Sequence, residues 1–274
     1  MNSNAGMPVT PPKPKLMFKK IRISILLLVL FMVGMNAWRS KAQAVEWKHP
    51  LHVVVFPING DGSDVSARYI AGLTLERFKQ VDEFFAAEAK RYGVTPAYGQ
   101  PPLRVALSPE VKSLPPMPPQ NGNALSIVAW SLRLRYWAWK HGDTDGIPAQ
   151  IRVFVVFHDP ATNPRLAHSI GLEKGLIGVV NAFAADDMAG QNNVVIAHEV
   201  LHTIGASDKY DPATNQPLYP DGFAEPARQP RYPQEAAEIM GGRIPLSETE
   251  AEIPETLLQA AVGEATAKEI GWQK

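Results

Sequence analysis

The chain has 274 residues, with 27 basic and 27 acidic side chains and a formal net charge of zero. This balance gives no electrostatic support for nucleic-acid binding, and a composition with 45% hydrophobic and 20% charged residues excludes disorder throughout. The chain has no cysteine, which excludes disulfides, thiol nucleophiles and thiolate metal sites. Any metal ligands must therefore be His, Asp or Glu.

The N-terminal region has the pattern of an export or anchoring signal. A basic segment without acids, residues 1–20, precedes an apolar segment, residues 21–38. About 18 residues is near the lower limit for a helix that crosses a bilayer, and the positive-inside rule places residues 1–20 in the cytoplasm. We predict a transmembrane signal anchor at 21–38, a linker at 39–48 and an extracytoplasmic domain at 49–274, in the periplasm or outside the cell. The alternative is a cleaved signal peptide and a secreted product, with Ala42-Gln43-Ala44 as the cleavage site.

Apolar patterning predicts one domain of alternating strands and helices after the linker. Strands are predicted at Leu51–Ile58, Leu103–Leu107, Ile151–Phe157 and Leu176–Phe183. Helices are predicted from about Ser66 to Arg91, at Ala124–Lys140, from a start near Asn192 or Asn193, and at Leu257–Ile270. The helix at 124–140 is apolar on nearly all sides, so we expect it to be packed into the core. Residues 114–120 are too rich in proline for a helix or an inner strand.

The helix near Asn192 carries the chemical motif. Its sequence includes His198-Glu199-Val200-Leu201-His202, an H-E-x-x-H pattern. Residues four apart lie on one face of a helix, so both imidazoles can bind one cation, as zinc requires of nitrogen ligands. Glu199 lies beside them, where its carboxylate can take a proton from a metal-activated water. The spacing therefore predicts a catalytic zinc site with Glu199 as the general base.

Asp208 is the leading candidate for the third ligand. Gly205 can adopt a positive φ at the end of the helix, which would return a side chain three residues later to the metal. A glutamate from the following stretch is the alternative third ligand: Glu225, Glu235 or Glu238. A further alternative is a calcium loop lined by oxygens of Asp208, Asp211, Asn215 and Asp221, although the segment has no EF-hand pattern.

The segment from His198 to Gly242 resembles the metzincin clan of zinc metallopeptidases, whose signature is H-E-x-x-H-x-x-G-x-x-H/D followed by a turn that contains methionine. Asp208 stands where most members have histidine, as in the snapalysin type, and Met240 in Glu238–Gly242 is the candidate for the turn methionine. The resemblance implies an α+β fold: a mixed twisted sheet with an antiparallel edge strand, an active-site helix, and a smaller, mostly irregular or helical C-terminal subdomain. In that family the edge strand binds the peptide, a role for which Leu176–Phe183 is our candidate.

We therefore expect a zinc metalloendopeptidase with one Zn²⁺ per chain, bound by His198, His202 and Asp208. Its partners would be a peptide or protein substrate and the membrane, with neither nucleic acid nor nucleotide. The chain has Gly242 where some metzincins have an oxyanion-stabilising tyrosine, and the possible substitutes are Tyr210, Tyr219, Tyr232 and Arg243. The rival hypothesis is a non-catalytic, membrane-anchored domain that binds metal or peptide.

Overall fold

The computed structural model describes residues 20–28, 31–32, 35, 46–119, 122–144, 146, 149–173 and 175–273. The chain divides into two units, residues 1–40 and 41–274. In the first unit, residues 20–28 are helical, and parts of the predicted anchor at 29–30, 33–34 and 36–38 lie outside the described residues. Among the residues that are described, no helix is both long enough and apolar enough to cross a membrane.

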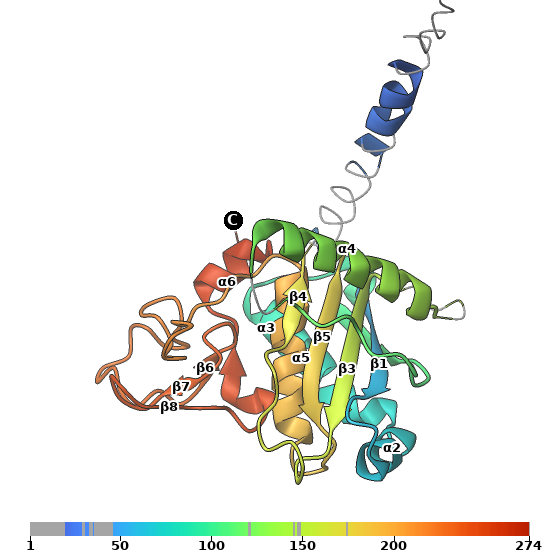
Figure 1. The fold of residues 1–274 in the computed structure, drawn as a ribbon. Coiled ribbons are helices and arrows are strands. Elements are labelled where there is room, and N and C mark those ends of the chain that lie inside the picture. The colour runs from blue at the N-terminus through green and yellow to red at the C-terminus, as the bar shows by residue number, and fades with distance from the viewer. Residues whose placement is uncertain are drawn as a thin grey trace, which may run out of the picture. The chain divides into compact units, whose positions relative to one another are not determined.

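The second unit is built on a five-stranded, mostly parallel sheet with the order β2-β1-β3-β5-β4 (Figure 1). Its strands are β1 (Leu51–Asn59), β2 (Leu103–Leu107), β3 (Ile151–His158), β4 (Ile170–Leu172) and β5 (Ile177–Phe183). The first four in spatial order are parallel, and β4 pairs antiparallel with β5 at the edge. The predicted α+β class with a mixed sheet is therefore confirmed.

The prediction that Leu176–Phe183 forms the edge strand of the sheet is wrong. The strand β5 lies between β3 and β4: its whole length pairs with β3, and Ile177–Val179 also pair with β4, so β4 is the edge strand there. Pattern analysis missed β4 because it has three residues, Ile170, Gly171 and Leu172, which is too short to show an alternation of apolar and polar side chains.

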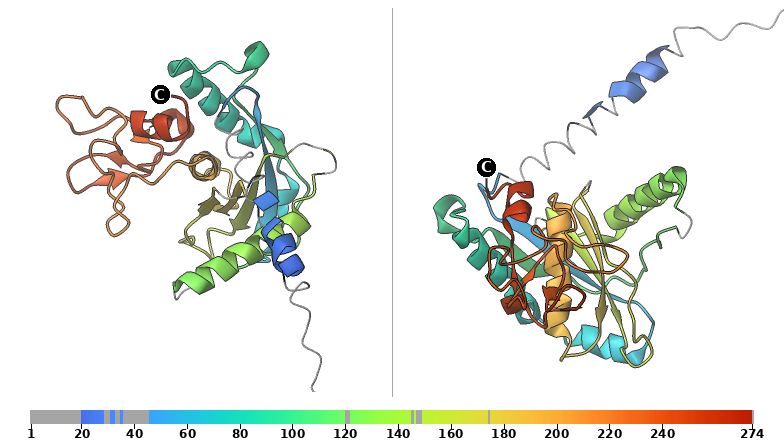
Figure 2. Two further views of the ribbon diagram at one scale, coloured as in Figure 1. Left: turned by 90° about the horizontal axis from the view of Figure 1, so that it is seen from above. Right: turned by 90° about the vertical axis from the view of Figure 1, so that its left-hand side faces the viewer.

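Two apolar clusters cover the two faces of the sheet. Figure 2 shows α4 (Ala124–His141) on one side of the strands and α5 (Ala189–Thr203) and α3 (Lys79–Arg91) on the other. The face toward α3 and α5 carries the larger cluster, which includes Val53, Val55 and Val153. The alternate residues Val54, Phe56 and Phe154 meet α4 instead. Since successive side chains of a strand point to opposite faces, nearly continuous apolar runs are what a sheet covered on both faces requires.

The helix predicted from about Ser66 to Arg91 is interrupted. It consists of α2 (Asp64–Ala71), the 3-10 turn η1 (Leu75–Phe78) and α3. Ser63 caps α2 by accepting a hydrogen bond from the amide of Ser66, and Gly72 ends it. Ile70, Phe78, Val81 and Phe85, from the three parts, all belong to the larger cluster.

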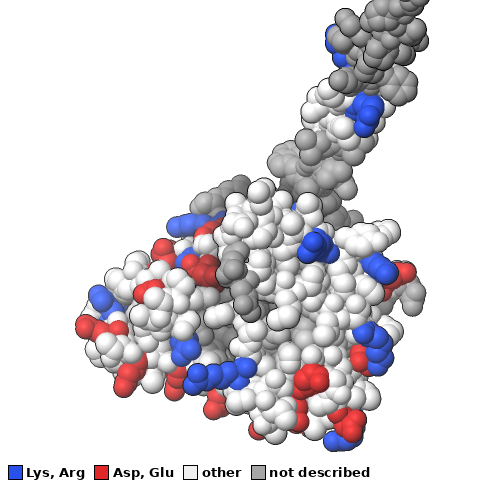
Figure 3. Space-filling model, in the orientation of Figure 1, with Lys and Arg blue, Asp and Glu red and all other residues white. Residues whose placement is uncertain are grey.

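The helix predicted at 124–140 is present as α4, but its expected position in the core is wrong. Only Leu134 and Ala138 are buried, and Trp137 packs edge-on against Phe154 with 4.6 Å between ring centroids. Much of its remaining apolar surface faces solvent, and the corresponding part of the space-filling view is mainly uncharged, with isolated Lys and Arg side chains (Figure 3). An apolar run thus predicted the helix correctly without indicating which of its sides are covered.

The part after α5 is mostly irregular. It contains the short strands β6 (Ala237–Glu238), β7 (Ile244–Pro245), β8 (Ala251–Glu252) and β9 (Ala260–Ala261), the turn η3 (Leu257–Gln259) and the helix α6 (Glu264–Glu269). The closing helix expected at 257–270 is therefore reduced to six residues. At the other end of the unit, Trp47, within the predicted linker, is buried and donates a hydrogen bond from Nε1 to the carbonyl of Ile270 at 2.7 Å.

Candidate metal centre

Helix α5 brings the motif to the sheet. It begins at Ala189, three residues earlier than predicted, so neither Asn192 nor Asn193 caps it. Both are buried: Asn192 exchanges hydrogen bonds with the backbone of Phe183 on β5, and Asn193 donates to the carbonyl of Arg77. Together with the buried stripe of Val194, Ala197 and Leu201, these contacts fix how far α5 is rotated about its axis.

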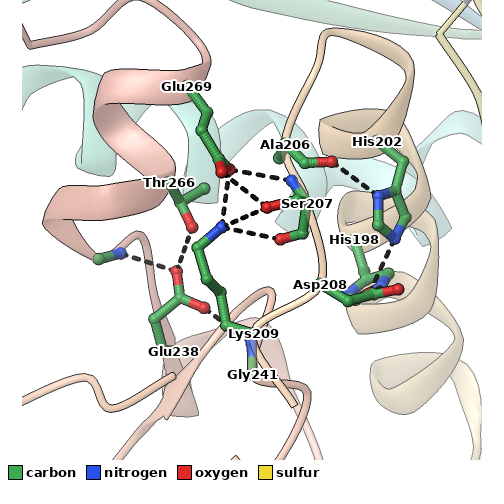
Figure 4. Close-up of polar contacts among 11 residues, drawn as sticks. His198, His202, Ala206, Ser207, Asp208, Lys209, Glu238, Gly241, Thr266 and Glu269 are labelled. Atoms are coloured by element: carbon green, nitrogen blue, oxygen red, sulfur yellow. Dashed lines mark hydrogen bonds and ion pairs between the residues drawn. The ribbon is translucent and has the colours of Figure 1, made fainter. Parts of the chain in front are cut away.

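The structure brings His198, His202 and Asp208 together (Figure 4). Asp208 Oδ1 lies 3.2 Å from His198 Nε2 and 3.0 Å from His202 Nε2, and the three potential ligand atoms are all within 4.8 Å of one another. Gly205, at φ 111°, reverses the chain between the helix and Asp208. A β-carbon is strained at that φ, which is why the turn takes glycine.

Both imidazoles are oriented by backbone carbonyls. His198 donates from Nδ1 to Ile239 at 2.9 Å, and His202 donates from Nδ1 to Ala206 at 2.8 Å. Because Nδ1 makes this bond, Nε2 is the nitrogen that each ring presents to Asp208 Oδ1, and such a second hydrogen bond is typical of histidines that bind metals. Two nitrogens and one carboxylate fit a divalent metal such as zinc, although they do not by themselves identify it.

The charges of the cluster are coupled. Partial burial works to raise the pKa of Asp208, but its contacts with His198 and His202 outweigh burial and hold that pKa well below its usual value. Burial works to lower the pKa of His198, yet the contact with Asp208 and the charge of Glu199 leave it raised. Asp208 therefore stays an anion, as a metal ligand must.

Glu199 lies on the buried side of the cluster. Its side chain is 4% exposed, and its Oε2 has no hydrogen-bond partner among the described residues. Burial raises the pKa of Glu199, while the neighbouring His198 and His202 lower it in part. A buried carboxylate oxygen without a partner is costly, which makes Glu199 a candidate functional group.

The edge strand β4 packs directly against this carboxylate. A β-carbon on Gly171 would lie 2.4 Å from His202 Cβ, 2.7 Å from the carbonyl oxygen of Glu199 and 3.1 Å from Glu199 Oε2. Only glycine therefore permits this approach of the strand to α5. Sequence analysis did not single out Gly171, because a lone glycine between Ile170 and Leu172 carries no pattern.

Two polar networks fix the loop and the turn around the site (Figure 4). Glu269 of α6 accepts hydrogen bonds from the amide and the hydroxyl of Ser207, at 2.9 and 2.6 Å, and from the buried Lys209 at 2.7 Å. These contacts hold both neighbours of Asp208. Contacts with Lys209 and Ser207 outweigh the effect of burial and lower the pKa of Glu269.

The second network lies below the first, at the turn that contains Met240. Met240 is fully buried, and its carbonyl accepts from the amide of Lys209 at 2.9 Å. Glu238, also fully buried, accepts from Gly241, Gly263 and Thr266, and so connects the turn to the start of α6. Since Ile239 in the same turn orients His198, this network supports the cluster of His198, His202 and Asp208.

The side chains considered as alternative metal ligands or oxyanion donors, apart from Tyr210, make contacts with other residues. Glu238 is committed to its own network, and Glu225 and Glu235 both form ion pairs with Arg228. The ring of Tyr219 lies under Arg231, Tyr232 packs against Phe223, and Arg243 points to the carbonyl of Ala251.

Tyr210 is coupled to the site. Burial raises the pKa of its phenol, the charges of Asp208 and Glu199 raise it further, and so does the hydrogen bond of its hydroxyl with Asp208. The hydroxyl therefore keeps its proton near neutral pH, as a hydrogen-bond donor requires.

The chain matches no protein-family model and no curated protein in sequence comparisons. Any functional conclusion therefore rests on the geometry of this cluster and on the sequence motif.

Proposed function

We propose that the chain is a zinc-dependent metalloendopeptidase of metzincin type, held at a membrane by its N-terminal segment with the domain outside the cytoplasm. One observation carries the proposal: the buried, unpartnered Oε2 of Glu199 lies beside a cluster of two histidines and one aspartate. A structural metal site needs no such carboxylate, whereas a hydrolytic site needs a base next to the cation.

Each residue has a defined task in this proposal. Zinc held by His198, His202 and Asp208 would supply Lewis acidity, which makes water more acidic and polarises the amide carbonyl. Glu199 takes one proton from the attacking water as the oxygen–carbon bond forms, and passes it to the amide nitrogen as the carbon–nitrogen bond breaks. Tyr210 donates a hydrogen bond to the oxygen that becomes negative.

A pair of variants tests the proposal. In Glu199→Gln, zinc content stays near one per chain while peptide cleavage falls at least about 100-fold, because the general base is lost. In Asp208→Ala, zinc affinity falls by more than the roughly 10–100-fold seen for partners outside the ligand shell. Elemental analysis and mass-spectrometric detection of cleavage in a peptide mixture, with and without chelator, measure both effects on the full chain in detergent.

The exposed Glu248, replaced by Gln, is the matched control and leaves both quantities unchanged. A zinc-loaded parent chain that cleaves no peptide would replace the proposal with the non-catalytic alternative. Cleavage by Glu199→Gln at the parent rate would remove Glu199 as the base.

A further inference from the structure

Helix α4 presents a continuous apolar stripe to solvent. Five exposed side chains follow helical spacing along one side, from 57% exposed for Val128 to 84% for Leu125: Leu125, Val128, Leu132, Tyr136 and Trp139. The stripe runs the length of an 18-residue helix. Soluble proteins rarely expose a continuous apolar surface of this kind unless something binds it.

The orientation of the helix is fixed, so the stripe cannot turn inward. Its opposite side is held to the sheet by the buried Leu134 and Ala138. Trp130 donates from Nε1 to the carbonyl of Pro116 at 2.8 Å, and Trp137 donates to Ser113 Oγ at 3.0 Å, so the flanking loop fixes the helix too. The exposure of the stripe is therefore built into the fold.

Charge and composition favour a lipid surface as the occupant. The helix carries Arg133, Arg135 and Lys140 and no acidic residue, in a chain whose total charge is zero. Tyrosine and tryptophan prefer the interface between acyl chains and water, and lysine and arginine are attracted to anionic headgroups. A second copy fits less well, because a symmetric contact between two stripes would place the cations of both helices together without a counter-charge on either helix.

We propose that α4 lies flat on an anionic phospholipid bilayer, with its apolar stripe at the boundary between headgroups and acyl chains. Since α5 covers the opposite face of the sheet, this docking turns the metal cluster away from the lipid (Figure 2). The domain then meets its substrates from the aqueous side while a second contact, besides the N-terminal segment, restricts its motion.

The absence of cysteine in the chain makes the test specific, since one introduced cysteine is the only site that a thiol reagent can label. In the full chain, Leu132→Cys carries an environment-sensitive nitrobenzoxadiazole fluorophore, and Ala227→Cys, at an exposed position in the C-terminal part, is the labelled control. Both proteins are reconstituted into vesicles of phosphatidylcholine with and without phosphatidylglycerol.

With phosphatidylglycerol, the emission of the label at 132 shifts to shorter wavelength and loses most of its quenching by aqueous iodide, whereas the label at 227 stays accessible. Replacing Arg133 and Lys140, both exposed, by Gln lowers the ratio of docked to undocked helix about five-fold for each charge. Full iodide access at 132 in both kinds of vesicle would overturn the proposal. So would protection at 132 in detergent that rises with protein concentration, which would assign the stripe to a second copy.

Discussion

Among single residues, Tyr210 gives the prediction that a measurement of the rate of peptide cleavage tests most directly. Its raised pKa has four causes, burial first, then the charges of Asp208 and Glu199 and the hydrogen bond to Asp208, and all four keep the phenol protonated beside the cluster. Tyr210→Phe removes the hydroxyl and keeps the ring. We expect kcat for peptide cleavage to fall about 100- to 1,000-fold, as for the loss of one oxyanion donor, with KM and zinc content little changed.

Tyr219→Phe is the matched control, because the hydroxyl of Tyr219 only approaches the carbonyl of Pro226, at 3.4 Å. Steady-state kinetics of the two variants separate a donor to the oxyanion from a phenol that only fills space. Equal kcat values for both variants would contradict the role of Tyr210.

The ligand cluster could be read from sequence because all its members lie within eleven residues. His198 and His202 are one helical turn apart, and one glycine reverses the chain before Asp208. The supporting residues could not be found in this way. Glu269 is 62 residues from the Ser207 that it holds, and Glu238 acts through amides of Gly241 and Gly263, so neither leaves a local pattern.

At the scale of elements, the packing of β4 on α5 gives the sharpest prediction. In Gly171→Ala, the new β-carbon meets His202 Cβ and the carbonyl of Glu199, so strand and helix must separate by a few tenths of an ångström or more. We expect the free energy of unfolding to fall by about 1–3 kcal/mol, as for overpacking of a core. Peptide cleavage should fall more than stability alone explains, since both neighbours of the new methyl belong to the site.

Gly72→Ala is the control for this substitution. Gly72 has a φ of −91°, and its added β-carbon would lie no closer than 3.6 Å to another atom, so stability should change by less than about 1 kcal/mol. Chemical denaturation and activity assays of both variants measure these effects. A Gly171→Ala protein with the stability and activity of the parent would mean that the strand approaches the helix less closely than described.

The positions of helices and strands in the sequence were easier to predict than which of their sides are buried. Apolar runs correctly indicated β1, β2, β3, β5, α4 and α5, because burial on both faces of a sheet or against it requires such runs. Side-chain patterns do not reveal which surfaces are covered, so the exposed stripe of α4 and the inner position of β5 were both predicted wrongly.

At the scale of the whole domain, α6 stabilises the loop that carries Asp208, because Glu269 contacts Ser207 and Lys209. The folded state lowers the pKa of Glu269 below its ordinary value of 4.5. The stabilisation is therefore complete above pH 4.5 and is lost as the pH falls through the lowered pKa. Glu269→Gln should lower the free energy of unfolding at pH 7 by about 1–3 kcal/mol, because the buried Lys209 loses its anion.

The difference between the two proteins should shrink steadily below pH 4.5, since the parent then carries a neutral side chain as well. This difference in the free energy of unfolding is measured by urea unfolding at a series of pH values from 7 downward. Chelator is present so that metal release does not contribute. Glu264→Gln is the control on the same helix, because Glu264 lies in the first turn of α6 and makes no described hydrogen bond or ion pair with Ser207 or Lys209. A difference that stays constant with pH would contradict an electrostatic role for Glu269.

The buried pair of Trp47 and Trp272, 5.3 Å apart between ring centroids, joins the two ends of the folded domain. The ribosome adds Trp272 only after every described helix and strand has been synthesised. The helix α6 lies just before it, and its residues Glu269 and Thr266 hold Ser207 and Glu238, which support Asp208 and His198. A nascent chain therefore lacks the contacts by which α6 holds Ser207, Lys209 and Glu238 until synthesis has nearly reached this tryptophan, so the surroundings of His198 and Asp208 are completed last.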